Sequence, residues 1–548
     1  MPSARWSLML ALCTMACTLR VAPSGDRAGG GTSAAGPGVA SVSLDALEAD
    51  LRFLAHDLLE GRAPGTRGGE LAAEYVATRF RAMGLEPAGP DRSFFQPVSL
   101  VGMMPHPTFV WGRDGATRSL RYRDDFVAWA ERPEERVTAD GEVLFVGYGV
   151  TAPEWQWDDY KDALVRDRIL LMLVNDPGLT DSTIFHGRVL TYYGRWTYKI
   201  EEAARRGARG IVLIHTTESA TYPWDVVRAS WSVEQFKLAE RTGPALEFAS
   251  WITQDAARSA IAWAGRSYDS LVTAAGRRDF QPVRLGLQAA VAVMSDVRRV
   301  NSHNVVARLP GADPAVAAEA VLFTAHWDHK GIGPAVSGDS IYNGAEDNAS
   351  GVAGMLAAAR ALAAAGPRLR RSIVFIATTA EESGLLGSEA YVHRPLVPLR
   401  QTAAVINLDV LNVRGPTRDI AALGAERSTL GEVFRAAALA ESLGVATEPD
   451  TRGSFYRSDH FPLARAGIPA LSFKSGLDYV GRPPAWGREQ DALWTQTRYH
   501  QPSDEYTGSF RFDGMAQQVR VAVRVARAVA DASSLPQWLP AAEFRRPQ

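Results

Sequence analysis

Short apolar runs separated by helical patterns dominate the chain after residue 301. Two segments between the runs, 350–364 and 434–443, and a third near the end, 514–532, have the spacing of helices. Continuous apolar runs of this length are typical of buried strands, and they lie at 304–309, 320–325, 373–378, 403–408 and 470–473. Buried strands alternating with helices predict an α/β fold, with a mostly parallel (mixed) sheet sandwiched by helices.

The front of the chain predicts two helices and then a second, smaller α/β unit. Residues 44–54 follow Ser43, a residue suited to cap a helix, and residues 69–83 form a second helical pattern that Gly84 is placed to end. Strand-like runs at 143–150, 169–174 and 210–215 then surround a helix at 198–206. This mixed unit continues to about residue 285.

The N-terminus predicts export. Residues 1–22 contain an apolar stretch after Arg5 and read as a secretory signal peptide, and the Gly-, Ser- and Pro-rich residues 23–42 read as a flexible linker. Cys17 is a possible lipid anchor, with simple cleavage as the alternative, so the protein would be periplasmic, extracellular or lipid-anchored. Because Cys13 and Cys17 are the two cysteines, the mature protein would have no disulfide.

Length and charge narrow the class of protein further. A chain of 548 residues exceeds one ordinary core, which favours two or three modules. With 59 basic and 61 acidic residues the net charge is −2, which gives no reason to expect a nucleic-acid partner or an anionic membrane. Because the chain after the signal has no uninterrupted apolar run of about 18 residues, no membrane span is predicted.

Acidic and imidazole side chains gather at the ends of the predicted strands. In open α/β sheets the carboxyl ends of the strands form the ligand site. Glu381 is an additional carboxylate beside the set, which is suited to act as a base toward a metal-activated water. Two histidines and three carboxylates are the inventory for two divalent cations that share a bridging carboxylate, and the candidates are His326, Asp347, Glu382, Asp409 and His500.

Polar residues near these candidates are expected either to support the ligands or to be solvated loop residues. Asp328 lies two residues after His326 in an extended segment, so we expect its carboxylate to accept the other ring N–H of that histidine. Asp459 and His460 are expected to support the ligands or to line a substrate pocket. The remaining nearby polar residues are expected to be solvated loop residues: His329, Asp339, Glu346, His393 and Asp419.

The motifs TAHWDH, AEDNASGVAGML, TAEESGLLGSEAYV, INLDV and YHQPSD resemble those of the co-catalytic dizinc aminopeptidase family. That family includes secreted bacterial leucyl aminopeptidases, aminopeptidase Y and glutamate carboxypeptidase II. The resemblance covers about 300–535, and LLEGRAPGTRGGELAAEYVATRFRAMGLEPAG resembles the family's N-terminal helices. It implies the phosphorylase/hydrolase-like fold of zinc exopeptidases.

The resemblance also implies roles for single residues. One zinc ion would be held by His326 and Asp409, a second by Glu382 and His500, and Asp347 would bridge the two Zn ions. Glu381 would be the general base, Tyr499 would polarise the substrate carbonyl, and the peptide bond after Asp347 would be cis.

Residues 138–285, with the stretch GRVLTYYGRWTYKIEEAARRGARGIVLIH, resemble a protease-associated domain. Such an insert divides the metallopeptidase catalytic domain into 43–137 and 286–535, with a C-terminal tail at 536–548. Its aromatic side chains either form a lid over the substrate or are ordinary core residues, and they are Tyr192, Tyr193, Trp196, Tyr222, Trp224 and Trp231.

The function predicted is that of a zinc-dependent metallo-aminopeptidase that hydrolyses peptide bonds at peptide or protein N-termini. Cobalt or manganese would fit the same ligands. A carboxypeptidase is one alternative, because Arg452, Arg457 and Lys474 could bind a substrate carboxylate. A glutaminyl-cyclase-like enzyme with one zinc and a non-catalytic receptor are the others; the complete set of ligands and base favours an enzyme over the receptor.

Overall fold

The computed structural model describes residues 42–240, 243–365 and 368–547. All described residues belong to one compact unit. The predicted signal peptide, both cysteines and the linker up to residue 41 lie outside the described residues. Within the described residues, no helix is both long and apolar enough to cross a membrane.

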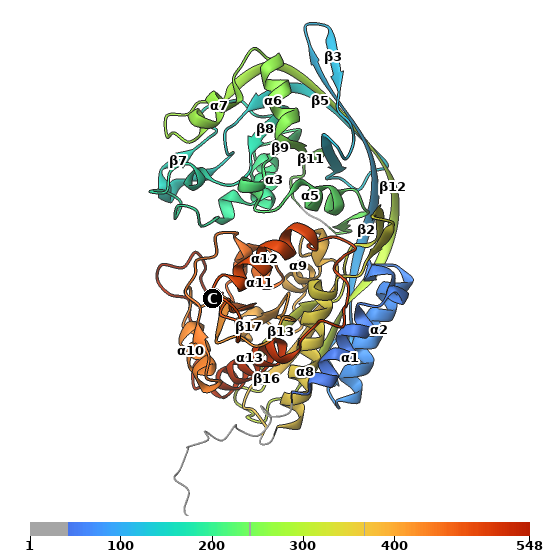
Figure 1. Ribbon diagram of the computed structural model, residues 1–548, viewed down its shortest axis with the longest axis vertical. Helices are drawn as coiled ribbons and strands as arrows, with labels where there is room; N and C mark the ends of the chain where they lie inside the picture. The colour runs from blue at the N-terminus through green and yellow to red at the C-terminus, as the bar shows by residue number, and fades with distance from the viewer. Residues whose placement is uncertain (1–41, 241–242, 366–367, 548) are drawn as a thin grey trace, which may run out of the picture. The chain divides into compact units, whose positions relative to one another are not determined.

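A single mixed sheet of sixteen strands runs through the described part of the chain (Figure 1). β1 (Glu86–Pro87), β2 (Phe95–Arg113), β3 (Ala116–Ser119) and β10 (Gln235–Leu238) pair beside its main path. Along that path the strands are β19 (Gly444–Val445), β18 (Asp419–Leu423), β20 (Ala470–Ser475), β17 (Thr402–Leu408), β13 (Ala320–His326), β16 (Ser372–Thr378), β12 (Val283–Leu309), β5 (Arg136–Phe145), β8 (Ile169–Leu173), β9 (Gly210–His215), β11 (Phe248–Thr253) and β4 (Phe126–Ala130). The predicted α/β class with a mixed sheet is confirmed.

The half of the sheet that carries the candidate ligands is buried on both faces. Its strands β13, β16, β17 and β20 are parallel neighbours. Along β13, Val321 and Phe323 face one apolar core and Leu322 faces another, as the two-residue period of a strand requires. The first core contains α1 (Leu44–Leu54), α2 (Arg67–Ala82), α8 (Ser350–Ala364), α10 (Leu430–Ala440) and α13 (Asp513–Asp531), and the second contains α9 (Leu386–His393) and α11 (His460–Arg465).

The other half of the sheet has two cores of its own. Leu170 and Met172 of β8 face the core under α3 (Trp196–Arg205) and α5 (Trp224–Trp231). Leu171, between them, faces the core under α6 (Gln254–Trp263) and α7 (Tyr268–Ala275). Strand β4, which precedes residue 138, pairs with β11 in this half. The boundaries 138 and 285 of a protease-associated insert remain a prediction.

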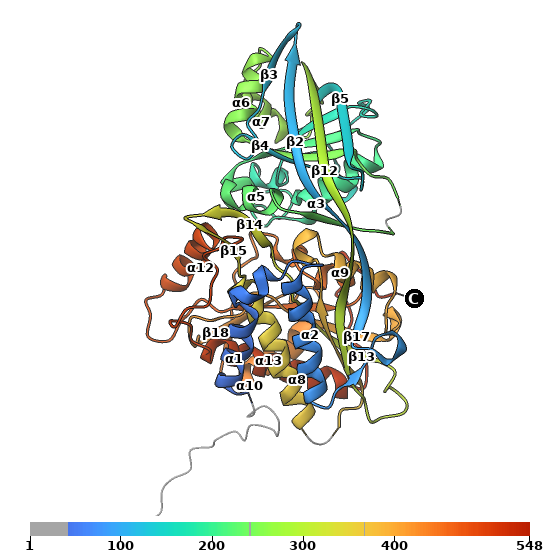
Figure 2. The same cartoon turned by 90° about the vertical axis from the view of Figure 1, so that its right-hand side faces the viewer.

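Two long antiparallel strands connect the halves, as Figure 2 shows. Strand β12 has 27 residues and pairs with the 19-residue β2 from Gln288↔Gly112 to Val305↔Phe95. The apolar pattern predicts only 304–309 of this strand. The remainder alternates buried residues such as Leu287 and Val291 with exposed polar ones, so it contains no continuous apolar run.

Several other expected elements agree closely with the structure, but the strand expected at 143–150 is β5, which runs from Arg136 to Phe145 and leaves 146–150 outside the strand. The helix at 350–364 and the strand at 210–215 have the expected bounds. Ser43 caps α1, because its hydroxyl accepts the N–H of Ala46 at 3.2 Å. The remaining elements are β6 (Thr151–Ala152), β7 (Trp157–Asp158), β14 (Gly331–Val336), β15 (Asp339–Tyr342), α4 (Thr217–Ala220), α12 (Trp486–Thr497) and short helical turns at Asp57–Arg62, Pro90–Arg92, Pro153–Trp155, Pro177–Leu179, Tyr192–Gly194, Ala345–Ala349, Glu381–Ser383, Leu399–Gln401 and Ser454–Tyr456.

Candidate metal centre

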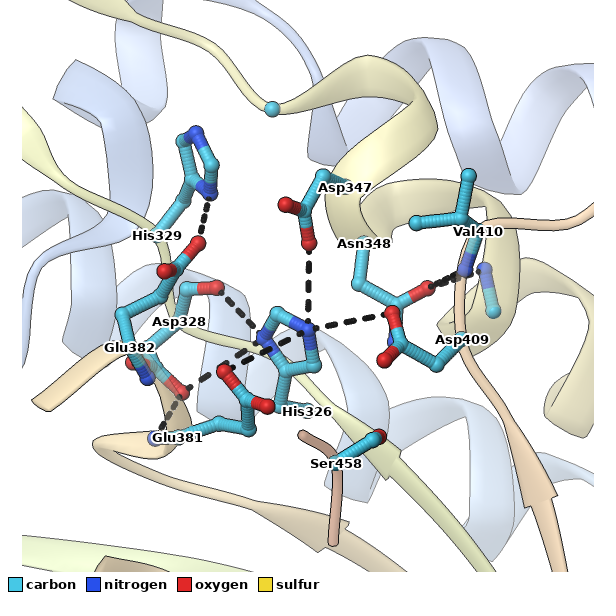
Figure 3. A network of polar contacts seen from close by, with 12 residues as sticks. His326, Asp328, His329, Asp347, Asn348, Glu381, Glu382, Asp409, Val410 and Ser458 are labelled. Carbon is cyan, nitrogen blue, oxygen red and sulfur yellow. Dashed lines mark hydrogen bonds and ion pairs between the residues drawn. The ribbon is translucent and has the colours of Figure 1, made fainter. Parts of the chain in front are cut away.

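The candidate ligands converge at the carboxyl ends of the parallel strands, and Figure 3 shows four of them, His326, Asp347, Glu382 and Asp409. His326 is the last residue of β13, and Asp409 directly follows β17. Glu381 and Glu382 form a helical turn shortly after β16, and Asp347 lies in the turn before α8. His500 lies in the connection between α12 and α13. Rigid strand ends therefore fix three parts of the site and connecting segments fix the other two.

Asp347 lies between the two histidines. Its Oδ1 is 3.2 Å from Nε2 of His326, and its Oδ2 is 3.5 Å from Nε2 of His500. Beyond them, Asp409 Oδ1 is 3.6 Å from Nε2 of His326, and Glu382 Oε2 is 3.1 Å from Nε2 of His500. The five side chains thus form two pairs joined by one carboxylate, which is the arrangement that a bridged pair of cations needs.

The ligand atoms are close enough to hold a metal ion. Two overlapping groups, His326 with Glu381 and Asp409, and His326 with Asp347 and Glu382, each place one atom per residue within 4.8 Å of the others. Burial raises the pKa of the Glu381 carboxyl well above its usual range, and the negative charges of Glu382 and Asp409 raise it further. Because buried carboxylates at this spacing repel one another, a cation among them would relieve a large electrostatic cost.

The model of peptidase family M28 matches residues 304–518, a segment that contains all of these residues. We call residues 304–518 the M28 domain, after the family that they match. Leupeptin-inactivating enzyme 1 of Streptomyces exfoliatus is 30% identical over 209 residues, which are 37% of this chain and 43% of that protein. Aminopeptidase YwaD of Bacillus subtilis (strain 168) is 31% identical over 188 residues, or 34% and 35% of the two chains. The matches therefore span less than half of these relatives.

A solved structure resembles almost the whole chain. The aminopeptidase from Aneurinibacillus sp. strain AM-1 matches with a TM-score of 0.51 and 19% identity, over 93% of this chain and 99% of that one. At this identity the similarity concerns the fold. The structural similarity extends beyond residues 304–518, so both halves of the sheet are present in that other protein.

We expected the Asp328 carboxylate to accept a ring N–H of His326, and the structure does not show this hydrogen bond. The Nδ1 atom of His326 is 3.1 Å from the backbone carbonyl of Asp328, whereas its carboxylate is 3.9 Å away. The carboxylate instead accepts the backbone N–H of Glu381 at 3.1 Å. The carbonyl reaches the ring because the chain leaves its strand at His326. Asp328 therefore orients the His326 ring through its backbone and the Glu381 turn through its side chain.

Two residues that we expected to be solvated are buried at the centre of the M28 domain. His329 is 1% exposed, and its Nδ1 is 2.5 Å from Glu382 Oε1. Glu346 is 2% exposed and pairs with Arg414 at 2.5 Å. The expectation was wrong for both because the loops after β13 and β15 fold inward over the strand ends. His393 is exposed, and Asp339 and Asp419 are partly exposed.

Further residues support the ligands, and of these the sequence singled out Asp459. The Lys330 ammonium is 3.1 Å from Glu382 Oε2. Arg62 is buried, and its guanidinium donates to the carbonyls of Trp327 at 2.8 Å and Gly344 at 3.0 Å, which ties both ligand loops to the N-terminal segment. Asp459 is buried and accepts from the Thr378 hydroxyl at the end of β16. Lys330 directly follows TAHWDH and Arg62 lies within the stretch LLEGRAPGTRGG, but the sequence assigned a role to neither.

The turn that carries Asp347 is held from both sides. The Asp347–Asn348 peptide bond is cis, as the resemblance implied. The Asn348 side chain donates to Leu408 O at 3.0 Å and accepts from the N–H of Val410 at 3.2 Å, which links this turn to the segment of Asp409. On the other side Asp504 accepts backbone N–H groups of the turn; it lies four residues after His500 in the motif that we had singled out.

A cavity of about 460 Å³ opens onto the ligands of the M28 domain. Glu381, Asp409 and His500 form part of its wall, and Tyr222 reaches it from the other half of the sheet. Tyr499 also lines the cavity, with its ring 3.9 Å from the His500 ring and 5.1 Å from Trp494. The cavity therefore places a phenol beside the candidate base and ligands.

The positively charged side chains around this cavity either form ion pairs with carboxylates or donate to neutral oxygens. Arg414, Arg452 and Arg488 are paired with the carboxylates of Glu346, Asp491 and Glu448. Arg457 donates to the Thr221 hydroxyl at 2.9 Å, and Lys474 donates to the backbone carbonyl of Asp409 at 3.2 Å. Among the described residues, no carboxylate lies within ion-pair distance of Arg457 or Lys474. Both cations line the cavity, and the charge of Lys474 also contributes to lowering the pKa of the nearby Asp409 carboxyl.

Proposed function

We propose that this protein is a zinc-dependent aminopeptidase that hydrolyses the N-terminal peptide bond of peptides or proteins. The observation that carries the proposal is the position of Asp347, whose two oxygens face His326 and His500 within the M28 domain. Two relatives, from Bacillus subtilis and Aneurinibacillus, bear the name aminopeptidase. The proposal assigns two zinc ions to the centre.

His326 and Asp409 would hold one zinc ion, Glu382 and His500 the second, and Asp347 would bridge them. The donors support this assignment, because mixed imidazole and carboxylate ligation suits zinc. When bound, zinc supplies Lewis-acid chemistry that polarises the scissile carbonyl and lowers the pKa of a water molecule.

Glu381 would act as the general base. Its backbone N–H donates to the Asp328 carboxylate at 3.1 Å, and its side chain reaches within 4.0 Å of His326 Nε2 without being needed as a ligand. It would take one proton from the attacking water and return it to the leaving amine, so one water is consumed for each peptide bond cleaved. Tyr499 would donate its hydroxyl proton in a hydrogen bond to the carbonyl oxygen as negative charge develops there.

The proposal includes export. Its support is the apolar stretch within residues 1–22, with a lipid anchor at Cys17 as a variant of the same route. We also propose that 138–285 is a protease-associated domain, supported by the separate cores of that half of the sheet.

A carboxypeptidase is the second candidate, and one observation favours it. Arg457 and Lys474 have no carboxylate partner among the described residues, so either could bind a substrate carboxylate. Aminopeptidase and carboxypeptidase would then differ in which end of the peptide lies against these cations.

The decisive experiment is a substrate panel measured with and without a metal chelator. Aminoacyl chromogenic substrates with a free amine should be cleaved, N-acetylated versions should not, and the chelator should abolish activity. Metal analysis should give two zinc ions per chain, whereas a cyclase-like enzyme would hold one. Cleavage of N-acetylated peptides from the C-terminal end would instead favour the carboxypeptidase. The Glu381→Gln protein, purified in parallel, reports contaminating peptidases.

A further inference from the structure

We infer that Ser230 is a positioning residue for His500. Ser230 lies in α5, a helix that covers the half of the sheet outside the M28 domain. The inference rests on the proposed function, because it treats His500 as a zinc ligand. The hydroxyl oxygen of Ser230 lies 2.7 Å from Nδ1 of His500, while Nε2 of the same ring faces Glu382 and Asp347. Ser230 and His500 are 270 residues apart in the chain.

The contact completes the hydrogen bonding of a ligand. A histidine that binds a metal through Nε2 keeps a proton on Nδ1, and an acceptor for that proton fixes the tautomer and the orientation of the ring. Among the described residues, the Ser230 hydroxyl is the one protein group within hydrogen-bond distance of His500 Nδ1. Ser230 therefore has the same relation to His500 that the Asp328 carbonyl has to His326.

The hydroxyl is held in place by the packing of its own helix. Ser230 is 1% exposed and lies in the last turn of α5. The next residue, Trp231, packs its ring against Trp129 at 5.3 Å and Trp196 at 5.1 Å. The Gln235 side chain donates to the Ser230 carbonyl at 2.9 Å. A buried, well-packed hydroxyl can orient a neighbouring ring, which a mobile surface serine could not.

The segment around His500 depends on this helix for its position. His500 has φ 56°, in the left-handed region that is unfavourable for residues other than glycine, so surrounding contacts must hold it. Tyr499 packs against the core that contains α5, and the Gln501 side chain donates to the carbonyl of Asp225 in α5 at 3.4 Å. Three consecutive residues thus contact α5 or its core, and the central one is the ligand.

The consequence is that α5 and one metal position are linked. Binding of the ion held by Glu382 and His500 should stabilise the docking of α5, and loss of the Ser230 hydroxyl should weaken that ion selectively. His326 and Asp409, which would hold the other ion, make no hydrogen bond or ion pair to α5 among the described residues. A selective effect on one of two ions is a signature that general destabilisation would not produce.

The test is a zinc titration of metal-free protein against a chromophoric chelator. For Ser230→Ala we expect one ion to bind 10- to 100-fold more weakly, as is typical when a partner of a ligand is removed, and the other to bind with little change. Ser230→Thr, which keeps the hydroxyl, should restore most of the affinity. Ser232→Ala is the matched control, because Ser232 lies two residues away and does not contact His500.

Two further measurements separate positioning from damage to the fold. The metal-free Ser230→Ala protein should melt within a few degrees of the wild type, and zinc should increase amide-exchange protection of α5 in the wild type more than in the variant. Wild-type affinity for both ions in Ser230→Ala would overturn the inference, as would equal weakening of both ions. The wild-type titration tests the proposed zinc content independently, and a wild type that binds both ions without cleaving peptides would leave the inference standing.

Discussion

The carboxylate of Asp504 accepts the backbone N–H of Asp347 at 3.0 Å. Its second oxygen accepts the N–H of Glu346 at the same distance, and the side chain is fully buried. Burial raises the pKa of Asp504 to about 8, with the charge of Glu346 contributing. The Asp504 side chain thus fixes the backbone of the turn that carries Asp347, the candidate bridging residue. It does not contact the Asp347 carboxylate through a hydrogen bond.

Above about pH 8, where the Asp504 carboxyl is ionised and both of its oxygens accept hydrogen bonds, replacing Asp504 by Asn should weaken metal binding. The amide can accept one N–H but presents an NH₂ group to the other, so the turn of Asp347 loses a hydrogen bond and shifts. We expect a 10- to 100-fold loss of zinc affinity and a loss of about 1–3 kcal/mol in the free energy of unfolding. Calorimetry and urea unfolding would measure the two effects. Glu505→Gln, at the adjacent exposed position, is the control; unchanged zinc affinity in Asp504→Asn would refute this role.

Glu381→Gln should separate metal binding from turnover. The amide has nearly the shape of the carboxylate but cannot take a proton, so zinc content should stay at the wild-type value. The turnover number should fall by roughly 10²- to 10⁴-fold, the usual contribution of a general base. Initial rates with an aminoacyl substrate, together with metal analysis of the same sample, provide the measurement. Wild-type turnover in this variant would remove Glu381 from the mechanism.

Asp347→Ala should instead lose metal. Each oxygen of Asp347 faces one of the two histidine positions, so one truncation removes a ligand from both. We expect both ions to be weakened and activity to be lost even in excess zinc. Asp339→Ala, a partly exposed aspartate outside the centre, provides the comparison. Full zinc occupancy in Asp347→Ala would show that the carboxylate does not bridge.

His215 should make the free energy of unfolding depend on pH between about 6.5 and 4. The side chain is 4% exposed, and burial lowers its pKa from 6.5 to about 4, although its Nε2 lies 3.0 Å from the Tyr222 carbonyl. The unfolded chain therefore binds a proton in this window before the folded chain does. The stabilisation is present above pH 6.5 and is lost as the pH falls toward 4, by up to about 3 kcal/mol.

Urea unfolding of metal-free protein at several pH values would measure this effect. His215→Gln should show a shallower decrease in the free energy of unfolding between pH 6.5 and 4 than the wild type. His393→Gln, at an exposed position, should keep the wild-type slope. The same slope in His215→Gln as in the wild type would assign the pH dependence to other groups.

Arg457 and Arg452 provide a matched pair for substrate selection. Both line the cavity, but Arg452 is paired with Asp491 at 2.9 Å whereas Arg457 donates to neutral oxygens. For substrates with a carboxylate beside the scissile bond, Arg457→Gln should lower kcat/KM at least tenfold relative to the corresponding amides. Arg452→Gln should change that ratio much less. Equal ratios in the two variants would argue against a carboxylate site at Arg457.

The sequence predicted those parts of the site that a strand end positions. The apolar run 320–325 carries His326 to the edge of the sheet, and the run 403–408 does the same for Asp409, so pattern and topology together bring the two close. Asp347 and His500 lie in connecting segments; the sequence named them as candidate ligands, but the resemblance of their motifs supplied the role of each. The α/β class followed from the same runs.

Burial of polar residues and contacts across the chain could not be predicted in this way. His329 follows Asp328 in the sequence like any loop residue, and only the inward path of its loop makes it a neighbour of Glu382. Alternation along a strand predicted a contact of the Asp328 carboxylate, but the strand ends before that residue. The meeting of Ser230 with His500 depends on how two halves of a sheet pack, for which a single sequence carries no local signal.

The continuity of β12 has a consequence for protein engineering. At about 3.3 Å per residue, a 27-residue strand is roughly 90 Å long, and β2 accompanies it for most of that length. Excising 138–285 would remove most of β5, a partner of β12, and all of β10, a partner of β2. Backbone groups along both strands would then lie unpaired at an exposed edge, a surface prone to aggregation. A trimmed enzyme would need both strands of this ribbon shortened together and rejoined by a designed hairpin.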